Sequence, residues 1–345
     1  MLFAYPTIAS EQNWLHECLR EMLQTVHSSL DRGTTPPDWD NLIPKGYQQA
    51  LKSRTSLRDA INRYRHALDK LPSEERERIY EALIDQNRIP DLLQGRCDCD
   101  TITDLPEPMR QPILDLFRCG FRLLTEFEIR DEHYSAIYDR IPAKMCPFCG
   151  LELFDAPTGP REALDHYLPE SLYPFAAANL YNLIPMGNKC NSRHKLATDI
   201  LRKDGIRRKS FDPYNPSPVA ISLEKSRLFA RDNETLPAWS IEFVPDTEEA
   251  ETWNDVFHIR ERYERDILNP SFKVWIGHFQ AWYRISNIPV TSKSLEAVVL
   301  QYIDLLGEYG YDDQSFLKIA LFRLFHLHIQ QDNQRLINLL LGVLT

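Results

Sequence analysis

Three short stretches of the sequence decide our prediction of the fold. They read Cys146-Pro-Phe-Cys-Gly, then Leu164-Asp-His-Tyr-Leu-Pro, then Asn182-Leu-Ile-Pro-Met-Gly-Asn-Lys-Cys-Asn-Ser-Arg-His-Lys. Together they combine paired thiols, a carboxylate beside a histidine, and two asparagines nine residues apart. Prolines and short extended runs set this part of the chain apart from its flanks. We therefore predict short strands here, with a helix only from about Lys189 onward.

The thiols have the spacing of a zinc knuckle. Cys146 and Cys149, followed by glycine, form a tight turn that aims two thiolates at one metal ion, and Cys190 is placed to add a third. A second Cys-x-x-Cys would begin at residue 187, which is Gly187. The predicted structural zinc therefore lacks a fourth ligand, for which the sequence offers His194, Cys97, Cys99 and Cys119. The alternative is a knuckle without zinc, held by packing and hydrogen bonds.

Asp165 and His166 are the candidate catalytic pair. Consecutive residues of a strand point to opposite faces, so one side chain can hold a cation while the other faces a reacting water. A histidine with a pKa near neutrality can take a proton from that water. A divalent ion on the other side of the phosphate would stabilise the leaving oxygen. Most Asp-His pairs are structural, so the pair needs support from the residues around it.

Taken together, the three stretches resemble an HNH endonuclease of the ββα-metal superfamily, in its knuckle-bearing subgroup. The resemblance implies a ββα module and metal-dependent cleavage of DNA. His166 resembles the general base and Asp165 the first metal ligand. Asn182 resembles the asparagine that braces the loop and orients the base, and Asn191 the metal ligand from the helix. The Cys146, Cys149 and Cys190 set resembles the structural zinc site.

Two positions depart from the family pattern. Gly187 replaces the expected fourth cysteine, and Lys195 stands where some members have a histidine. The catalytic ion would then be held by oxygen ligands, namely Asp165, Asn191, phosphate and water, which favours Mg²⁺ or Mn²⁺. Lys195 either contacts phosphate or is a solvated lysine.

Charge is distributed unevenly along the chain. The formal net charge of −10 argues against a protein whose whole surface binds nucleic acid. A basic run nevertheless follows the candidate site, opposed only by Asp199 and Asp204. We predict that it contacts the phosphate backbone, the alternative being a solvated helix face. The predicted nucleic-acid-binding residues are Lys189, Arg193, Lys195, Arg202, Lys203, Arg207 and Arg208.

The flanking regions complete a mostly helical α+β protein. Residues 1–140 form a helical region, 141–215 the nuclease module with its knuckle, and 216–345 a mixed, mainly helical region. Helices are predicted over 10–30, 48–71, from Ser73 with that serine as cap, 109–127, 253–268 and 315–341, and a strand over 238–244. The proline-rich residues 211–218 read as a linker.

The bulk properties place the protein in a broad class. Seven cysteines without an export signal favour a reducing compartment, and the apolar runs are too short to span a membrane, so we expect a cytoplasmic protein. The predicted function is endonucleolytic hydrolysis of DNA. One alternative is a catalytically silent zinc-knuckle module that binds nucleic acid or protein. Another is a nuclease subunit that acts only with a partner, such as an ATPase in a phage-defence or restriction-like system.

Overall fold

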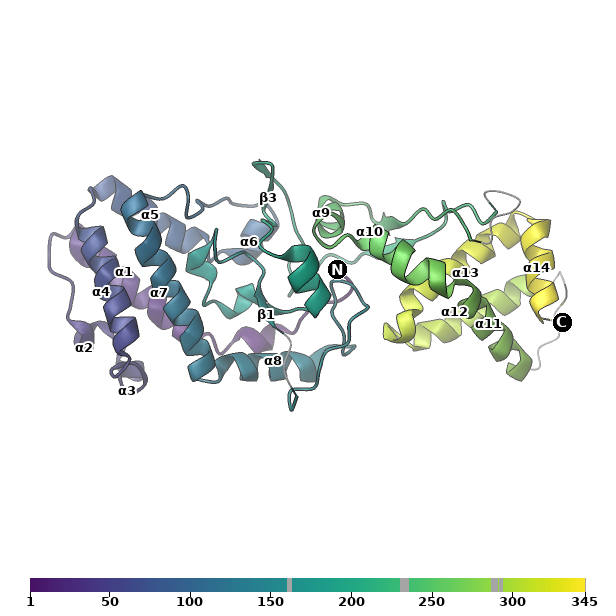
Figure 1. Ribbon diagram of the computed structural model, residues 1–345, viewed down its shortest axis with the longest axis horizontal. Coiled ribbons are helices and arrows are strands. Elements are labelled where there is room, and N and C mark those ends of the chain that lie inside the picture. Colours follow the sequence, from purple (N-terminus) through teal and green to yellow (C-terminus); the bar gives the residue numbers. More distant parts are fainter. Residues whose placement is uncertain (160–162, 230–235, 287–290, 292–293, 345) are drawn as a thin grey trace. The chain divides into compact units, whose positions relative to one another are not determined.

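The computed structural model describes residues 1–159, 163–229, 236–286, 291 and 294–344, and it is a mostly helical α+β structure. The chain forms two compact units (Figure 1). The N-terminal unit comprises Ala4–Cys146 and Glu152–Ser217; the C-terminal unit comprises Met1–Phe3, Pro147–Leu151 and Pro218–Thr345. The N-terminal helices and the residues of the candidate catalytic pair therefore belong to one unit.

Helices build most of the N-terminal unit. Helix α1 carries the predicted apolar stripe, with Leu15, Leu19 and Leu23 buried. Helix α4 packs on α7, and α1 packs on α5 and α7 (Figure 1). The unit contains η1 (Thr7–Ser10), α1 (Trp14–Asp31), α2 (Trp39–Leu42), η2 (Lys45–Tyr47), α3 (Gln48–Leu51), α4 (Thr55–Asp69), α5 (Ser73–Asp85), α6 (Ile89–Leu93), α7 (Glu107–Glu126) and α8 (Ile129–Arg140).

Two predictions for this region were wrong in detail. The helix predicted over 48–71 is divided into α3 and α4, because Arg54 has non-helical backbone angles (φ −82°, ψ 79°) and its N–H closes a turn onto Leu51. Ser73 does not cap α5; it is the first helical residue, and Pro72 occupies the cap position. Extended Pro72 (φ −63°, ψ 158°) enters the helix without needing a hydrogen bond from its nitrogen.

A strand–strand–helix arrangement follows the helices. Strand β1 (Leu164–His166) pairs antiparallel with β2 (Leu183–Pro185), and His166 lies opposite Leu183. Between them lie η3 (Pro174–Ala176) and η4 (Leu180–Asn182), and after them comes η5 (Cys190–Lys195), a single π-helical segment. Leu164 and Leu183 belong to the same buried core as α1, α4 and α7, so the helical core fixes both strands. A small hairpin, β3 (Arg202–Lys203) with β4 (Ile206–Arg207), completes the unit.

The segment predicted as a linker is partly core. Phe211, Pro213 and Tyr214 are buried in the N-terminal unit, and the Pro213 carbonyl accepts a 2.9 Å hydrogen bond from the N–H of Tyr5. Exposure begins at Asn215, shortly before Pro218 opens the main part of the C-terminal unit. The aromatic rings explain the difference, because burying them outweighs the extended preference of the prolines around them.

The C-terminal unit joins one hairpin to a set of helices. Its elements are β5 (Ala220–Ser222) paired with β6 (Glu242–Val244), α9 (Glu248–Phe257), α10 (Ile259–Arg262), η6 (Tyr263–Leu268), α11 (Asn269–Ser286), α12 (Leu295–Glu308), η7 (Asp312–Gln314), α13 (Ser315–Gln330) and α14 (Gln334–Leu344). The helix predicted over 253–268 starts earlier and is interrupted at His258, and the one predicted over 315–341 is interrupted near Asp332. Both residues have a left-handed φ, 52° and 57°, which ends an α-helix.

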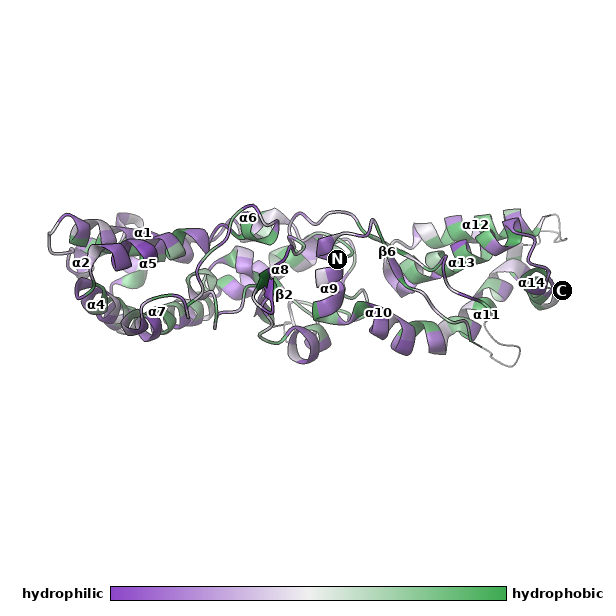
Figure 2. Cartoon of the chain, turned by 90° about the horizontal axis from the view of Figure 1, so that it is seen from above, coloured by the Kyte–Doolittle hydropathy of each residue, from purple (hydrophilic) through white to green (hydrophobic). Residues whose placement is uncertain are grey.

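Hydrophobic and hydrophilic residues alternate around the helices of both units, as Figure 2 shows in green and purple. This amphipathic pattern is typical of helices that bury one side in a protein core. Among the residues that the structure describes, no helix has the length and apolar character needed to span a membrane.

Candidate functional site

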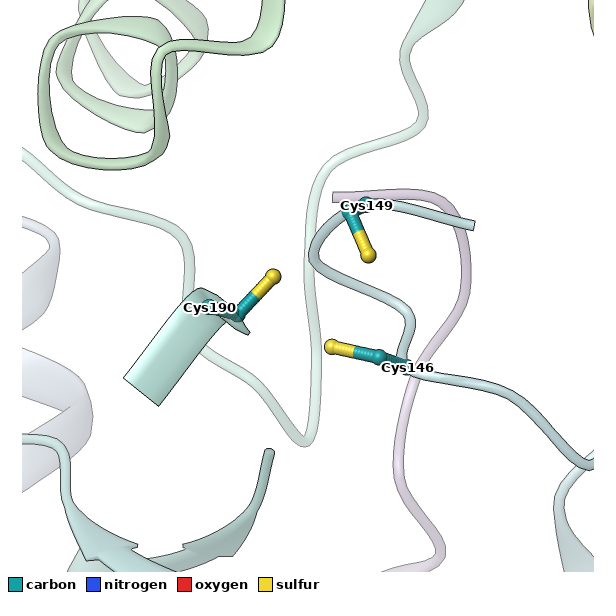
Figure 3. A group of neighbouring side chains, drawn as sticks. All are labelled: Cys146, Cys149 and Cys190. Carbon is teal, nitrogen blue, oxygen red and sulfur yellow. The ribbon is translucent and has the colours of Figure 1, made fainter. Parts of the chain in front are cut away.

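Three cysteine side chains converge on one small space. The Sγ atoms of Cys146, Cys149 and Cys190 all lie within 4.8 Å of one another, and all three residues are 0% exposed. Figure 3 shows the sulfur atoms pointing toward one another. Zinc–sulfur bonds of about 2.3 Å in a tetrahedron separate sulfur atoms by about 3.8 Å. The predicted thiol set is therefore brought together in a geometry that fits a metal ion such as zinc.

The backbone around the first two thiols forms a tight hairpin turn. The N–H of Cys146 donates to the Glu152 carbonyl at 2.8 Å, and Met145 pairs with Leu153 in an isolated bridge. Gly150 has a left-handed φ of 65°, and a Cβ there would collide with Leu2 and Phe316. Only glycine meets both demands, so this residue of the Cys-x-x-Cys-Gly pattern is required by the turn itself.

The sequence offered four candidates for a fourth ligand, and none lies in the thiol group. Within the described residues, the group contains only the three cysteines. Cys119 instead contacts Ser56, with 3.7 Å between its Sγ and the serine Oγ. The buried Cys99 belongs to a different part of the unit, where its carbonyl accepts from Arg202. Position 187 is also closed to a side chain, since a Cβ on Gly187 would meet Glu152 Oε2 at 2.7 Å.

His166 ends β1 with a defined ring orientation. Its Nε2 lies 3.0 Å from the carbonyl oxygen of Ala177. Because a carbonyl oxygen only accepts, Nε2 carries the proton and Nδ1 carries the lone pair of the neutral ring. The ring packs on Phe121 with 4.5 Å between centroids. Burial lowers the pKa of His166, partly opposed by the nearby Glu170 carboxylate, so the ring is held neutral and able to accept a proton.

Asn182 holds the loop that orients this histidine. Its side chain is fully buried. The amide Nδ2 donates to the carbonyls of Leu168 (3.0 Å) and Ala176 (3.2 Å), and Oδ1 accepts from the N–H of Leu168 at 2.7 Å. These bonds fix the loop between the two strands directly beside Ala177, whose carbonyl binds the His166 ring. The side chain thus ties Leu168 to Ala176 within this loop.

Asp165 has a partner that the sequence did not suggest. The Nζ of Lys195 lies 2.7 Å from Asp165 Oδ2 and donates to the His166 carbonyl, also at 2.7 Å. Lys195 is 0% exposed, which contradicts both predicted roles, a phosphate contact and a solvated lysine. Burial raises the pKa of Asp165 and lowers that of Lys195, and each charge opposes the shift of the other. A buried ion pair therefore ties the end of η5 to β1.

This ion pair constrains the predicted catalytic metal. Carboxylate and amide oxygens are suitable ligands for Mg²⁺ or Mn²⁺, and Asn191 lies partly exposed in the first turn of η5. The carboxylate of Asp165, however, is already neutralised by the Lys195 ammonium. A divalent ion at Oδ2 would have to displace that ammonium, since two cations cannot share one oxygen without strong repulsion.

The predicted nucleic-acid-binding residues fall into two groups. Arg202 and Arg207 bind Asp98, at 2.6 and 3.4 Å, and the largely buried Arg208 donates to the Asp199 carbonyl at 2.6 Å. These arginines, like Lys195, hold the protein together. The remaining members are exposed: Lys189, Arg193 and Lys203. The basic run is thus not a single solvated face, and its exposed part is smaller than the sequence suggested.

Sequence reasoning overlooked two residues at these sites, Lys195 as an ion-pair partner and Glu152. Lys195 follows Asp165 by thirty positions, and no periodic pattern connects them. Glu152 follows the Cys-x-x-Cys-Gly turn, but nothing in its spacing marks it. No family model, curated protein or solved structure matches this chain.

Proposed function

We propose that this protein is an endonuclease that hydrolyses phosphodiester bonds in DNA, with His166 as the general base. The observation that carries the proposal is the hydrogen bond from His166 Nε2 to the Ala177 carbonyl, on a loop braced by Asn182. It leaves Nδ1 as the basic nitrogen, at the end of a strand that pairs antiparallel and is followed by a short helical segment. The HNH resemblance supports this assignment, because it expects the base at the end of the first strand and the bracing asparagine at the beginning of the second.

The proposed reaction follows from the state of the ring. Neutral His166 accepts a proton from water at Nδ1, and the water oxygen attacks the phosphorus. The bond between phosphorus and one sugar oxygen breaks, and the freed oxygen takes up a proton. Asn182 and Ala177 keep the ring in place, and burial against Phe121 favours its neutral form. Mg²⁺ or Mn²⁺, bound through Asp165 and Asn191, would supply charge stabilisation at the leaving oxygen.

Substrate binding in this proposal uses the exposed part of the basic run. Lys189 lies just before η5 and Arg193 lies within it, both close in sequence to Asn191. Lys203 lies on the β3–β4 hairpin. Contacts from these side chains to phosphates would position the DNA without reading its sequence. A zinc ion in the thiol group would hold η5 against the knuckle turn, as a structural rather than a catalytic ion.

One observation favours the alternative, a catalytically silent module that binds nucleic acid or protein. Lys195 already neutralises Asp165, so the chain supplies its own cation at the carboxylate where the resemblance expects a metal ion. In such a module the strand–strand–helix arrangement would be a scaffold, and His166 a buried structural residue.

The deciding experiment is relaxation of supercoiled plasmid by purified protein, with and without Mg²⁺ or Mn²⁺. We expect His166→Ala to lower the cleavage rate by about 10²- to 10⁴-fold, the usual contribution of a general base. His278→Ala is the matched control. Because His278 is exposed on α11, this variant should cleave plasmid at the wild-type rate. Cleavage by His166→Ala at the wild-type rate would refute the assignment of the base.

A wild-type protein that binds labelled DNA but does not cut it would favour the silent module. The nuclease that needs a partner is tested by adding the products of neighbouring genes to the same assay. Cleavage that appears only with such a partner, and that His166→Ala abolishes, would retain the proposed chemistry and place its control in the partner.

A further inference from the structure

The space beside Gly187 is already filled. A Cβ built at Gly187 would lie 2.7 Å from Glu152 Oε2 and 2.8 Å from Glu152 Cβ, both far inside van der Waals contact. Residue 187 is where the first cysteine of a second Cys-x-x-Cys would stand, three residues before Cys190. The side chain of Glu152 therefore occupies the volume that the missing cysteine would need.

The Glu152 carboxylate also accepts the hydrogen bonds available at this turn. Oε1 accepts from the N–H of Lys189 at 2.8 Å, and Oε2 accepts from the N–H of Cys190 at 3.1 Å. Two successive backbone N–H groups that point the same way form a concavity that binds an anion. In a knuckle with four cysteines, the anion beside these amides would be the thiolate of residue 187. Here a carboxylate takes its place.

Glu152 makes hydrogen bonds to the backbone of two of the three cysteines. Its carbonyl accepts from the N–H of Cys146 at 2.8 Å, and its side chain accepts from the N–H of Cys190. Each carboxylate oxygen has two acceptor sites. Carboxylate oxygens are ordinary zinc ligands, with bonds of about 2.0–2.2 Å.

We propose that Glu152 replaces the missing fourth cysteine and completes a zinc site of three thiolates and one carboxylate. Among the described residues, the group that can hold a metal contains only the three cysteines, so ion binding draws the Glu152 side chain inward by rotation about its own bonds. Its backbone, fixed by the bond from Cys146, stays in place. The proposal concerns the structural ion only and does not depend on nuclease activity.

The test compares zinc binding across a set of substitutions. The variants are Glu152→Gln, Glu152→Ala, Gly187→Cys, and the double variant Glu152→Gly with Gly187→Cys, which also removes the Glu152 Cβ that would collide with the new side chain. Zinc content is measured after dialysis and affinity by competition with a chelator, while X-ray absorption at the zinc edge gives the numbers of sulfur and oxygen ligands. Glu11→Gln, which changes an exposed glutamate in the same unit, is the matched control.

Wild type should hold one zinc with three sulfur ligands and one oxygen. Glu152→Gln and Glu152→Ala should weaken zinc binding at least tenfold, and Gly187→Cys alone should also weaken it because the new side chain collides with Glu152. The double variant should regain tight binding with four sulfur ligands. With Co²⁺ as the probe, its sulfur-to-metal charge-transfer band should be about one third stronger than that of wild type, because four thiolates contribute instead of three.

Three results would overturn the proposal. One is a wild-type protein that binds no zinc. Another is a Glu152→Ala variant that binds zinc as tightly as wild type and with the same ligands, three sulfur atoms and one oxygen. That result would make water the fourth ligand. The third is a double variant that fails to gain a fourth sulfur although it is folded by circular dichroism. If Glu152→Ala alone does not fold, the isosteric Glu152→Gln and the double variant still decide the question.

Discussion

Replacing Lys195 by methionine tests the most unexpected contact at the site. The substitution keeps most of the side-chain volume and removes the ammonium. It leaves the Asp165 carboxylate, 13% exposed, without the cation that lies 2.7 Å away, and the His166 carbonyl without its donor. Removing one partner of a buried ion pair costs about 3–5 kcal/mol, because the remaining charge stays buried and uncompensated. We expect the N-terminal unit to lose stability by about that amount at pH 7.

The expected loss has a distinctive pH dependence. Burial already raises the pKa of Asp165 in the presence of Lys195, and without the lysine the shift becomes larger. A carboxyl whose folded pKa lies above its unfolded value favours folding when protonated and opposes it once ionised. The destabilisation in Lys195→Met should therefore be full at pH 7 and should shrink as the pH falls toward the ordinary value of 3.8.

Urea unfolding followed by circular dichroism, at pH 7 and at about pH 4.5, measures both effects. Lys189→Met is the matched control: an exposed lysine of the same basic run, whose loss should change stability by at most about 0.5 kcal/mol. Adding Asp165→Asn to Lys195→Met should recover most of the loss, since the buried charge is then gone. A cost below about 1 kcal/mol for Lys195→Met, or one that does not vary with pH, would refute this account of the pair.

Two further predictions concern the brace and the core. Asn182→Ala leaves the buried N–H and carbonyl of Leu168 without partners, while the Ala176 carbonyl keeps the N–H of Asn179. The substitution should therefore destabilise the N-terminal unit by about 3 kcal/mol and lower plasmid cleavage along with it. Unfolding and cleavage measured on the same preparations check both effects, and a stable, fully active variant would contradict the bracing role. His16 is buried in α1, and burial lowers its pKa from 6.5 to about 3. Below pH 6.5 the unfolded chain therefore binds a proton that the folded chain does not, so the free energy of unfolding falls as the pH falls. His16→Leu should remove this loss, and its stability relative to wild type should rise by about 2 kcal/mol between pH 7.5 and pH 5; an unchanged difference in urea unfolding would show that His16 is not the acid-sensitive group.

The helices illustrate what periodicity alone can predict. The apolar stripe of α1 and the run that became α7 were visible in the sequence, because the spacing of buried residues along a helix repeats locally. The interruptions at Arg54, His258 and Asp332 were not. The break at Arg54 depends on a turn that its N–H closes onto Leu51. His258 and Asp332 have a left-handed φ, which ordinary residues adopt only when packing and hydrogen bonds around them compensate.

The candidate site divides in the same way. Residue types and spacing led to the three thiols as one group, and the structure brings their sulfur atoms together. The HNH resemblance led to His166 and Asn182, which lie at the end of β1 and just before β2. Only the Cys-x-x-Cys-Gly turn rests on short-range chemistry, because it closes on itself; Cys190 and Asn182 were added through the knuckle pattern and the HNH resemblance. Only the tertiary structure placed Lys195 against Asp165 and Glu152 in the space beside Gly187. Both contacts join residues about thirty or more positions apart, so they form only because η5 packs against β1 and the knuckle turn. Burial then decides which charged groups remain available for chemistry.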